Sequence, residues 1–287
     1  MVAVPFVPLK SLSSVLTATY YGVKRGLCTL TRYERIALGA WLATWISTPI
    51  ALWTKGEHIF PYWVSLGVLT QVVLTVGILV RVWTPLQLAS IVGKILIGAW
   101  AIEVVGVHTG WPFGHYAYSD LLQPQLGRVP LLIPFAWLMM LPPAWAVAAA
   151  ILSCNRSEGA RRLSNPLTMA VLAGVAFTAW DTFLDPQMVA RGLWRWATPG
   201  EYLGIPLLNF AGWWFAATLL TAVVRPRDIP RMPLLLVYTL TCILQAIGLG
   251  IFWGQPVAAL CGTITMGSFA LTAWIRESSR WKYSSGP

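Results

Sequence analysis

Three carboxylic acids stand inside otherwise apolar stretches of this sequence, and they are the residues best suited to chemistry. Glu103 lies in Leu86–Val107, whereas Asp181 and Asp185 lie in Pro166–Met188. A charged side chain near the centre of a bilayer costs about 2.5–3.5 kcal/mol or more, so each acid needs a function or a partner. A rise of about 1.5 Å per residue places all three at a similar depth, about 22–28 Å along their helices.

Asp181 and Asp185 are four residues apart, so one helix face carries both. Like charges at this spacing disfavour joint ionisation. Pro186 favours a helix end directly after Asp185, where the helix dipole also disfavours a carboxylate. The spacing therefore predicts one carboxyl group that stays protonated beside one that stays ionised, which suits a general acid paired with a water-activating base. The alternative is that the pair caps or bridges a neighbouring loop.

Aromatic residues gather in and just after the two loops that follow these stretches, 108–129 and 185–205. The candidate substrate-binding side chains are Trp111, Phe113, Tyr116, Tyr118, Trp194, Trp196, Asn209 and Trp213. As a set beside three acids, the rings could line a slot for a flat apolar chain and stabilise a transient cation by roughly 0.5–2 kcal/mol per ring. The alternative is a belt of interfacial aromatic residues, which is common at membrane surfaces.

The remaining polar candidates fit other chemistries poorly. Lys94 lies nine residues from Glu103, hence on the opposite helix face, and can extend back toward the lipid head groups. His108 and His115 could join Glu103 at a metal ion, but three histidines in all are too few for the histidine boxes of a membrane di-iron oxygenase. No metal site is therefore expected.

The composition indicates which elements must position these residues. Hydrophobic residues make up 57% and charged residues 10% of 287, and the mean hydropathy is +0.66. Soluble domains carry about 25% charged residues, so most of this chain must lie in lipid or against itself. Stretches of about 18–24 residues can cross a hydrocarbon core of roughly 30 Å. The predicted spans are Ile36–Trp53, Tyr62–Trp83, Leu86–Val107, Pro130–Leu152, Pro166–Met188, Pro206–Val224, Pro233–Trp253 and Val257–Ile275. The predicted fold class is all-α, a polytopic transmembrane helical bundle of about eight spans.

The 20 Lys and Arg residues divide unevenly between the two ends of such a bundle. Only Lys55, Arg128, Arg191 and Arg195 fall on the side of the aromatic loops, and nearly all others fall on the side of the termini. This positive-inside bias predicts that both termini are cytoplasmic and that the acids lie toward the non-cytoplasmic face of the cell membrane. The net charge of +10 then reflects topology and contact with anionic lipid rather than nucleic-acid binding. The expected division is 1–35 as a cytoplasmic or interfacial segment, 36–275 as the catalytic transmembrane domain and 276–287 as a cytoplasmic tail.

A short internal repetition links the two acid-bearing regions. Val129-Pro-Leu-Leu is followed by Ala136-Trp137, and Ile205-Pro-Leu-Leu is followed by Gly212-Trp213. Each motif comes after an aromatic loop that itself follows an acid-bearing span. The repetition predicts a duplicated hairpin related by an axis along the membrane normal. Chance is the alternative, because proline is ordinary in the first turn of a helix.

Two regions carry a longer pattern. The first is Glu103-Val-Val-Gly-Val-His-Thr-Gly-Trp-Pro-Phe-Gly-His-Tyr-Ala-Tyr118, together with Val129–Met140. The second comprises Asp181-Thr-Phe-Leu-Asp-Pro186, Gly192-Leu-Trp-Arg-Trp196 and Gly204-Ile-Pro-Leu-Leu-Asn-Phe-Ala-Gly-Trp213. The pattern resembles the membrane carotenoid hydratases, the carotenoid 1′,2′-hydratase or bisanhydrobacterioruberin hydratase family, from the second span through the sixth. That family has an acidic residue where this chain has His115, which argues against catalysis by His115.

The resemblance implies a carotenoid-biosynthesis hydro-lyase that adds water across the terminal 1,2 double bond of an acyclic carotenoid end group to give a tertiary alcohol. On this reaction we expect Asp185 to protonate C2 and Asp181 or Glu103 to deprotonate the attacking water. Asn209 is expected to orient that water, while the indoles shield the tertiary cation at C1.

A proton and water suffice for this reaction, so no cofactor is expected. The expected partners are an acyclic carotenoid, water and membrane lipid, with other carotenoid-pathway enzymes as candidates and no nucleic acid. Two alternatives come from other functional classes, namely an ion- or proton-coupled transporter and a non-catalytic carotenoid- or lipid-binding membrane protein.

Overall fold

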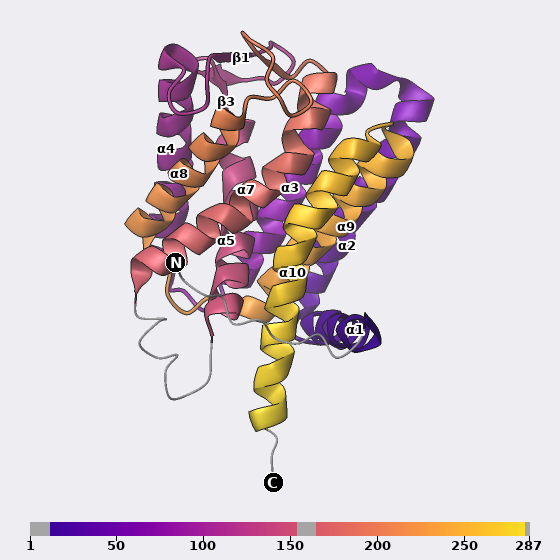
Figure 1. Cartoon of the computed structure of the whole chain (residues 1–287), viewed down its shortest axis with the longest axis vertical. Coiled ribbons are helices and arrows are strands. Elements are labelled where there is room, and N and C mark those ends of the chain that lie inside the picture. Colours follow the sequence, from indigo (N-terminus) through magenta and orange to yellow (C-terminus); the bar gives the residue numbers. More distant parts are fainter. Residues whose placement is uncertain (1–11, 154–164, 285–287) are drawn as a thin grey trace.

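The computed structural model describes residues 12–153 and 165–284, and in these ranges the chain is a bundle of long helices (Figure 1). Eight helices in the described ranges are long and apolar enough to cross a membrane. They confirm the all-α, multi-pass architecture expected from the composition. The spans are α2 (Arg32–Lys55), α3 (Phe60–Leu79, preceded by the 3-10 turn η1, Glu57–Ile59), α4 (Pro85–Thr109), α5 (Leu132–Leu152), α7 (Pro166–Ala190), α8 (Leu207–Val224), α9 (Arg231–Ile247, extended by the π-helical turn η2, Gly248–Phe252) and α10 (Pro256–Ser284).

Local sequence explains several of the helix starts. Thr31 before α2 and Thr84 before α4 each form a capping box, with Glu34 and Gln87 respectively, so the first backbone N–H groups are satisfied. Proline occupies the first turn of α3, α4 and α7, where its missing N–H costs nothing. These signals hold the helices in a defined register along the bundle.

The expected helix end after Asp185 is wrong. Helix α7 continues through Pro186 to Ala190. Proline removes the hydrogen bond that would reach the carbonyl of Thr182, four residues earlier. The hydroxyl of Tyr202, from the following loop, donates to that carbonyl at 2.8 Å. A tertiary contact therefore replaces the lost helical bond, and Asp185 lies inside the helix rather than at its end.

Helix α5 is the centre of the bundle. It is the most buried of the spans, whereas α4 is the least buried and lies at the periphery. Helices α3, α4, α7, α9 and α10 all pack against α5. Residues on α5 therefore face the interior on nearly every side, since every residue from 133 to 150 except Phe135 is buried.

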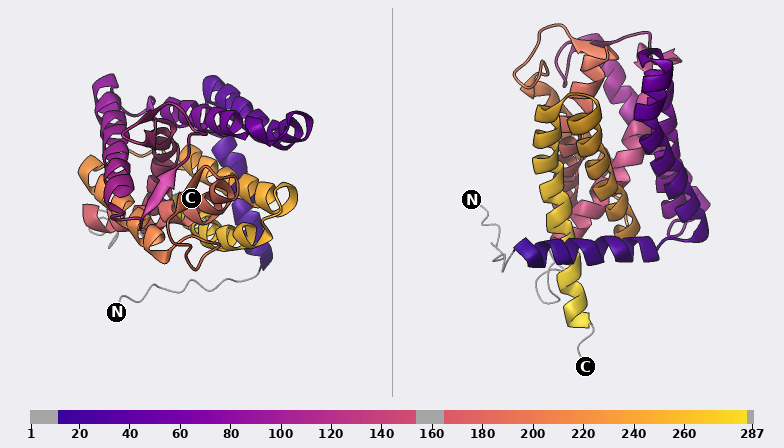
Figure 2. Two further views of the ribbon diagram at one scale, coloured as in Figure 1. Left: turned by 90° about the horizontal axis from the view of Figure 1, so that it is seen from above. Right: turned by 90° about the vertical axis from the view of Figure 1, so that its right-hand side faces the viewer.

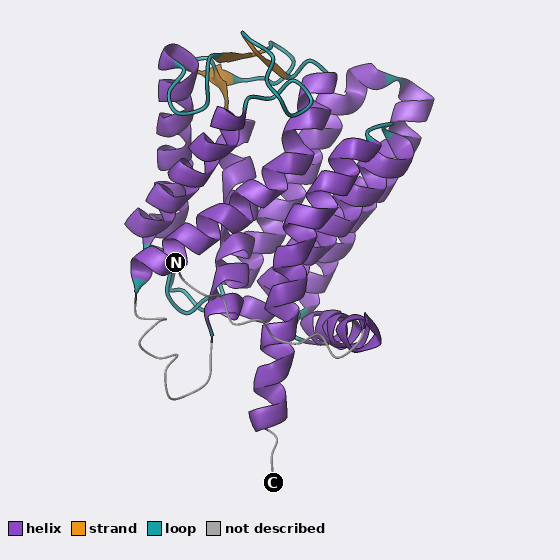
Figure 3. Ribbon diagram, in the orientation of Figure 1, coloured by secondary structure: helices purple, strands orange, loops and turns teal. Residues whose placement is uncertain are grey.

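The two aromatic loops meet at one end of the bundle, at the top of Figure 1. Strand β1 (Tyr116–Tyr118) of the first loop pairs antiparallel with β4 (Trp194–Trp196) of the second. A second small sheet, β2 (Gln125–Leu126) with β3 (Val129–Pro130), closes the first loop onto the start of α5 (Figure 3). The loops thus form a folded cap over the acid-bearing helices.

The opposite end of the bundle carries α1 (Leu12–Cys28), which lies across the spans nearly at right angles (Figure 2). Gly22 permits this close crossing, because a Cβ there would lie only 2.4 Å from the ring of Trp274 on α10. Placement of α1 at a membrane surface stays a prediction, as does the division into 1–35, 36–275 and 276–287. Helix α10 extends past the expected end of its span at Ile275 to Ser284.

Basic residues separate along the bundle axis as the positive-inside pattern requires. Lys55, Arg128, Arg191 and Arg195 belong to segments at the loop end (Figure 1). The segments at the opposite end carry most other basic residues that the structure describes, while Lys10, Arg156, Arg161 and Arg162 lie outside the described residues. Lys94 is exposed on the outer surface of α4, apart from the acids. Which end faces the cytoplasm stays a prediction.

Candidate active site

Glu103 is held by three hydrogen-bond donors. It is 2% exposed, near the loop end of α4. Its Oε2 accepts from the hydroxyls of Tyr116 at 2.5 Å and Tyr118 at 2.8 Å, and its Oε1 accepts from the indole Nε1 of Trp137 at 3.3 Å. Three donors converging on one carboxyl group form the bonding pattern of a carboxylate, which accepts through both oxygens.

The short strand β1 makes this arrangement possible. Tyr116 and Tyr118 are two residues apart on a strand, so both side chains leave the same face and reach the same oxygen. Gly106 of α4 lies beneath them, and a Cβ there would come within 2.9 Å of the Tyr116 hydroxyl. Burial raises the pKa of both tyrosines well above 10.0, and the charge of Glu103 raises it further. The phenols therefore remain protonated donors.

Asp181 and Asp185 form the second acidic group, one turn apart on α7, and both are almost fully buried. The Nδ2 atom of Asn209 donates to Asp181 Oδ2 at 3.0 Å and to Asp185 Oδ2 at 2.5 Å. The indole of Trp194 donates to Asp185 Oδ1 at 3.0 Å. One amide nitrogen thus bridges two carboxyl groups and holds them side by side.

The aspartate pair is less completely satisfied than Glu103. Asp181 Oδ1 is buried and has no hydrogen-bond partner among the described residues. The two carboxyl groups lie side by side, since Asn209 Nδ2 is 3.0 Å from an oxygen of Asp181 and 2.5 Å from an oxygen of Asp185. Two buried carboxyl groups this close disfavour joint ionisation, because like charges repel. The geometry is therefore suited to a pair of carboxyl groups that share a proton.

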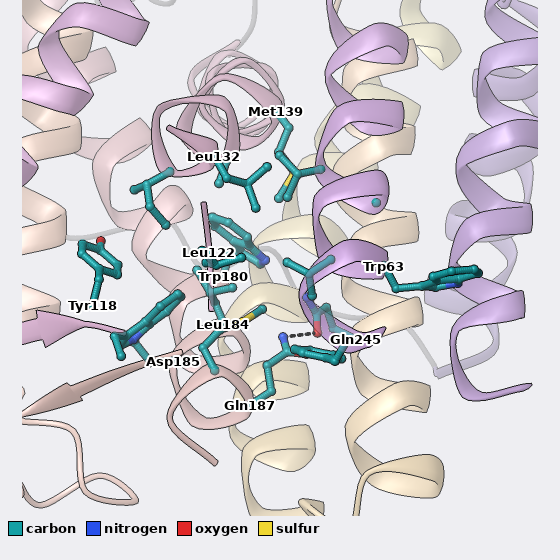
Figure 4. A pocket seen from close by; sticks show the side chains of 18 of the residues that line it. Trp63, Tyr118, Leu122, Leu132, Met139, Trp180, Leu184, Asp185, Gln187 and Gln245 are labelled. Carbon is teal, nitrogen blue, oxygen red and sulfur yellow. Dashed lines mark hydrogen bonds between the residues drawn. The ribbon is translucent and has the colours of Figure 1, made fainter. Parts of the chain in front are cut away.

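The acids open onto one elongated cavity, which leaves about 1000 Å³ free of protein atoms when counted out to its open mouth. Figure 4 shows Tyr118 and Asp185 at one end and Trp63 at the other, with Leu132, Met139, Trp180 and Leu184 along the walls between them. An apolar passage that ends at carboxyl groups suits a long apolar molecule whose tip is the reacting part.

Most of the candidate residues from the sequence meet at this cavity. Its lining includes Glu103, Phe113, Tyr116, Tyr118, Asp185, Trp194, Trp196, Asn209 and Trp213. Asp181 lies behind Asp185 rather than on the wall. Trp111 is not brought to the cavity, because it lies at the rim with 59% of its surface exposed and packs edge-on against Phe215 at 5.3 Å.

Two further aromatic residues near the acids, Trp137 and Phe177, were not among the site residues predicted from the sequence. Trp137 belongs to the repeated motif at the start of α5. Its partner Glu103 lies 34 residues earlier in the chain, on α4, so local sequence does not predict their contact. Trp137 and Phe177 stack with Trp213, which lines the cavity, at 5.1 Å and 5.4 Å. Gly212, the glycine before Trp213 in the matching motif, lets α8 approach the first loop closely, since a Cβ there would lie 2.6 Å from the carbonyl oxygen of Pro112. The repetition of Trp137 and Trp213 was the available signal.

The histidines lie apart from the acids. His108 and His115 are both exposed, and His108 Nδ1 lies 2.9 Å from the carbonyl of Val104 in its own helix. Across the described ranges, no three His, Cys, Asp or Glu side chains are placed to share a metal ion. Within the run from Glu103 to Tyr118, the two tyrosines converge on hydrogen bonds to Glu103.

The chain is 32% identical over 155 residues to a protein of Haloarcula japonica named bisanhydrobacterioruberin hydratase. That alignment covers 53% of this chain and 50% of the relative, so the chain spans half the length of the relative it matches. No solved structure matches it.

The family comparison covers more of the chain and includes all three acids. Residues 61–269 match the family described as carotenoid biosynthesis protein. This range includes both aromatic loops, all three acids and the helices α4 to α8 that position them. It confirms the resemblance seen in the motifs around Glu103 and Asp181, and the chain therefore belongs to the carotenoid biosynthesis protein family.

Proposed function

We propose that this protein is a carotenoid hydratase, which adds water across the terminal 1,2 double bond of an acyclic carotenoid end group to give a tertiary alcohol. Membership of a carotenoid biosynthesis family supports the substrate class, and the name of the similar Haloarcula japonica protein supports the reaction type. The observation that carries the proposal is the wall position of Asp185. It is a buried carboxyl group at the end of an aromatic cavity, with a second carboxyl group directly behind it.

The first step is protonation of the alkene. Asp185 donates a proton to C2, and the electron pair of the double bond forms the new C–H bond. The cation then lies at C1, which carries three carbon substituents. The rings of Trp194, Trp196 and Trp213 line this end of the cavity, and ring faces stabilise a cation by roughly 0.5–2 kcal/mol each.

The second step is capture of the cation by water. A water oxygen forms the C1–O bond, and one proton of that water passes to the aspartate pair, which gave up a proton to C2 in the first step, so the protein ends in its starting state. Asp181 suits proton return because it lies in contact with Asp185 through Asn209. Both hydrogens of the Asn209 amide are directed at carboxylates, so this residue can orient water only through its Oδ1.

Glu103 supplies negative charge at the same end of the cavity. Its carboxyl group lines the same cavity as that of Asp185, and its donor Tyr118 packs edge-on against Trp194, which donates to Asp185. A fixed negative charge near C1 stabilises the developing cation in a low-dielectric site. The proposal therefore separates the roles of the acids, with proton transfer by the aspartate pair and electrostatic stabilisation by Glu103.

The same proposal includes a location. We place the multi-pass chain in the cell membrane with both termini cytoplasmic, on the ground that basic residues concentrate at the end opposite the cap. The active site then lies toward the non-cytoplasmic face. Its partners are the carotenoid, water and surrounding lipid, and other carotenoid-pathway enzymes could deliver the substrate.

The test is expression in cells that accumulate lycopene or a related acyclic carotenoid, followed by mass analysis of the pigments. We expect products heavier by one water that carry a tertiary hydroxyl. In ¹⁸O-labelled water the hydroxyl should carry the label, whereas an unlabelled hydroxyl would indicate an oxygenase. Unchanged pigments from several acyclic substrates would overturn the proposal and favour a transporter or a non-catalytic binding protein.

A further inference from the structure

The cavity extends well beyond the acids, and this extension has no role in the chemistry described above. It runs from Asp185 past α5 toward α2, α3 and the end of η2. Its outer walls include Trp45 of α2, Trp63, Val64 and Gly67 of α3, and Trp253. We call this outer part the distal arm.

The polar groups on the distal arm are largely satisfied by the protein itself. Thr44 and Thr48 donate to the carbonyls of Ala40 and Thr44 in their own helix, so their methyl groups are left to line the arm. Gln71 donates to the carbonyl of Met139 on α5 and to the hydroxyl of Thr241 on α9. The indole Nε1 of Trp253 is buried without a partner among the described residues. Apart from that group, the arm offers a ligand mainly methyl groups, methylene groups and rings.

The distal arm opens at the side of the bundle rather than at its end. Among the lining residues most are buried, and those that keep some exposure are Trp45, Trp63, Val64, Gly67 and Trp253, together with Tyr118 and Leu132. The first four belong to α2 and α3, and Trp253 directly follows η2. The rings of Trp53 and Phe252 lie 5.7 Å apart at a tilted angle, and these residues are 69% and 40% exposed. The opening therefore lies within the apolar height of the spans.

We propose that the distal arm binds the conjugated tail of the carotenoid and is the route by which the substrate enters laterally from the bilayer. This inference rests on the proposed function, because the end group must reach Asp185 while the rest of the molecule lies elsewhere. A carotenoid is far longer than the space beside the acids, so its tail must leave the bundle. Trp45 and Trp253, whose rings lie 6.1 Å apart, flank the arm with flat surfaces that suit a planar polyene.

Two substitutions on α3 test the arm without disturbing the acids. Gly67→Phe and Val64→Trp each place a bulky ring at the mouth, and a Cβ at Gly67 would meet nothing within 4 Å. The matched controls are Gly77→Phe and Val73→Trp on the same helix but outside the cavity. A Cβ at Gly77 also meets nothing within 4 Å, and Val73 is 63% exposed. All four variants should therefore fold.

The measurement is the amount of lycopene retained per purified protein, read by absorbance, with each variant made in an Asp185→Asn background so that turnover does not matter. Gly67→Phe and Val64→Trp should lower retention by at least about tenfold, whereas the two controls should retain as much as the parent. Equal retention by all four variants would overturn the inference. A loss confined to the arm variants, in a protein whose wild type forms no hydroxylated product, would support the arm and reject the hydratase proposal.

Discussion

The hairpins α4–β1–α5 and α7–β4–α8 have the same arrangement of elements but differ in the hydrogen bonds that their acids receive. Each has a span with acid near its loop end, an aromatic strand in the loop and a tryptophan in the following helix. The strands pair with Ala117 opposite Arg195 at the centre of the register, and Trp137 stacks on Trp213 with the ring planes 18° apart. Both contacts join equivalent positions, as a two-fold axis along the bundle would require. They support the duplicated hairpin predicted from the repeated Pro-Leu-Leu motif.

The difference between the hairpins lies in how many donors each acid receives. In the first, a single carboxyl group accepts from two phenols and an indole. In the second, two carboxyl groups share one amide and one indole, and Asp181 Oδ1 has no partner among the described residues. A satisfied carboxylate is a stable charge, whereas an under-satisfied pair retains a proton that can move. We infer that the first hairpin fixes the electrostatics and the second performs the proton transfer.

The largest expected effect comes from the second hairpin. Asp185→Asn preserves the shape of the side chain but removes the transferable proton, and general acids contribute about 10²–10⁴ in rate. Hydroxylated carotenoid should fall by that factor in a pigment assay while the protein remains in the membrane.

A suitable control is Asp120→Asn, because Asp120 is an exposed acid in the first aromatic loop. It should convert pigment at the parental rate. Near-normal product from Asp185→Asn would show that Asp185 is not the proton donor. The second hairpin could then not be assigned the proton transfer.

The next largest effect is expected at the bridge between the two aspartates. Asn209→Leu removes the donor that holds both carboxyl groups, and an uncompensated buried polar group costs about 1–3 kcal/mol. We expect a lower thermal unfolding midpoint together with a loss of product. Asn209→Gln keeps an amide and should recover part of both. If Asn209→Leu lost stability but kept full activity, the bridge would be structural only.

Much of this arrangement could be predicted from local sequence. The spans follow from hydropathy and length, and the common depth of Glu103, Asp181 and Asp185 follows from the helical rise per residue. The resemblance in the two aromatic loops correctly indicated the family. Each of these features depends on residues that are close together in the chain.

The remainder depends on contacts between distant residues. Pro186 was expected to end α7, but the hydroxyl of Tyr202 satisfies the carbonyl that proline leaves free. The pairing of β1 with β4 decides which ring faces which acid, and nothing in either loop alone specifies that register. The distal arm was not foreseen because Val64, Gly67 and Trp45 look like ordinary residues of membrane helices. Only their shared position on the wall of one cavity distinguishes them.

A smaller effect is expected from pH in the first hairpin. The folded protein raises the pKa of Tyr116 and Tyr118 above the ordinary value of 10.0 through burial and the charge of Glu103. Below pH 10 both phenols are protonated in the folded and unfolded states, so their stabilising contribution is fully present. Above pH 10 the unfolded state releases protons that the folded state retains, so stability should fall as pH rises.

Thermal unfolding followed from pH 8 to pH 11 measures this decline. The double variant Tyr116→Phe, Tyr118→Phe should be less stable at pH 8, since it loses two bonds to Glu103, and should show a shallower decline above pH 10. An unchanged slope would mean that the phenols do not respond to Glu103 as the hydrogen bonds indicate.

The smallest effect is expected at Trp111, an exposed aromatic residue of the first loop that contacts neither the acids nor the cavity. Trp111 is 59% exposed and contacts Phe215 rather than the cavity. Surface substitutions usually change the free energy by roughly ±0.5 kcal/mol or less. Trp111→Ala should therefore change carotenoid conversion by less than about twofold. Trp196 is its informative counterpart, because it lines the cavity and donates to the carbonyl of Phe113 at 3.0 Å. Trp196→Ala should reduce conversion severely. Equal losses from both substitutions would show that the cap acts as one rigid unit, in which case the rings do not act on the cation individually.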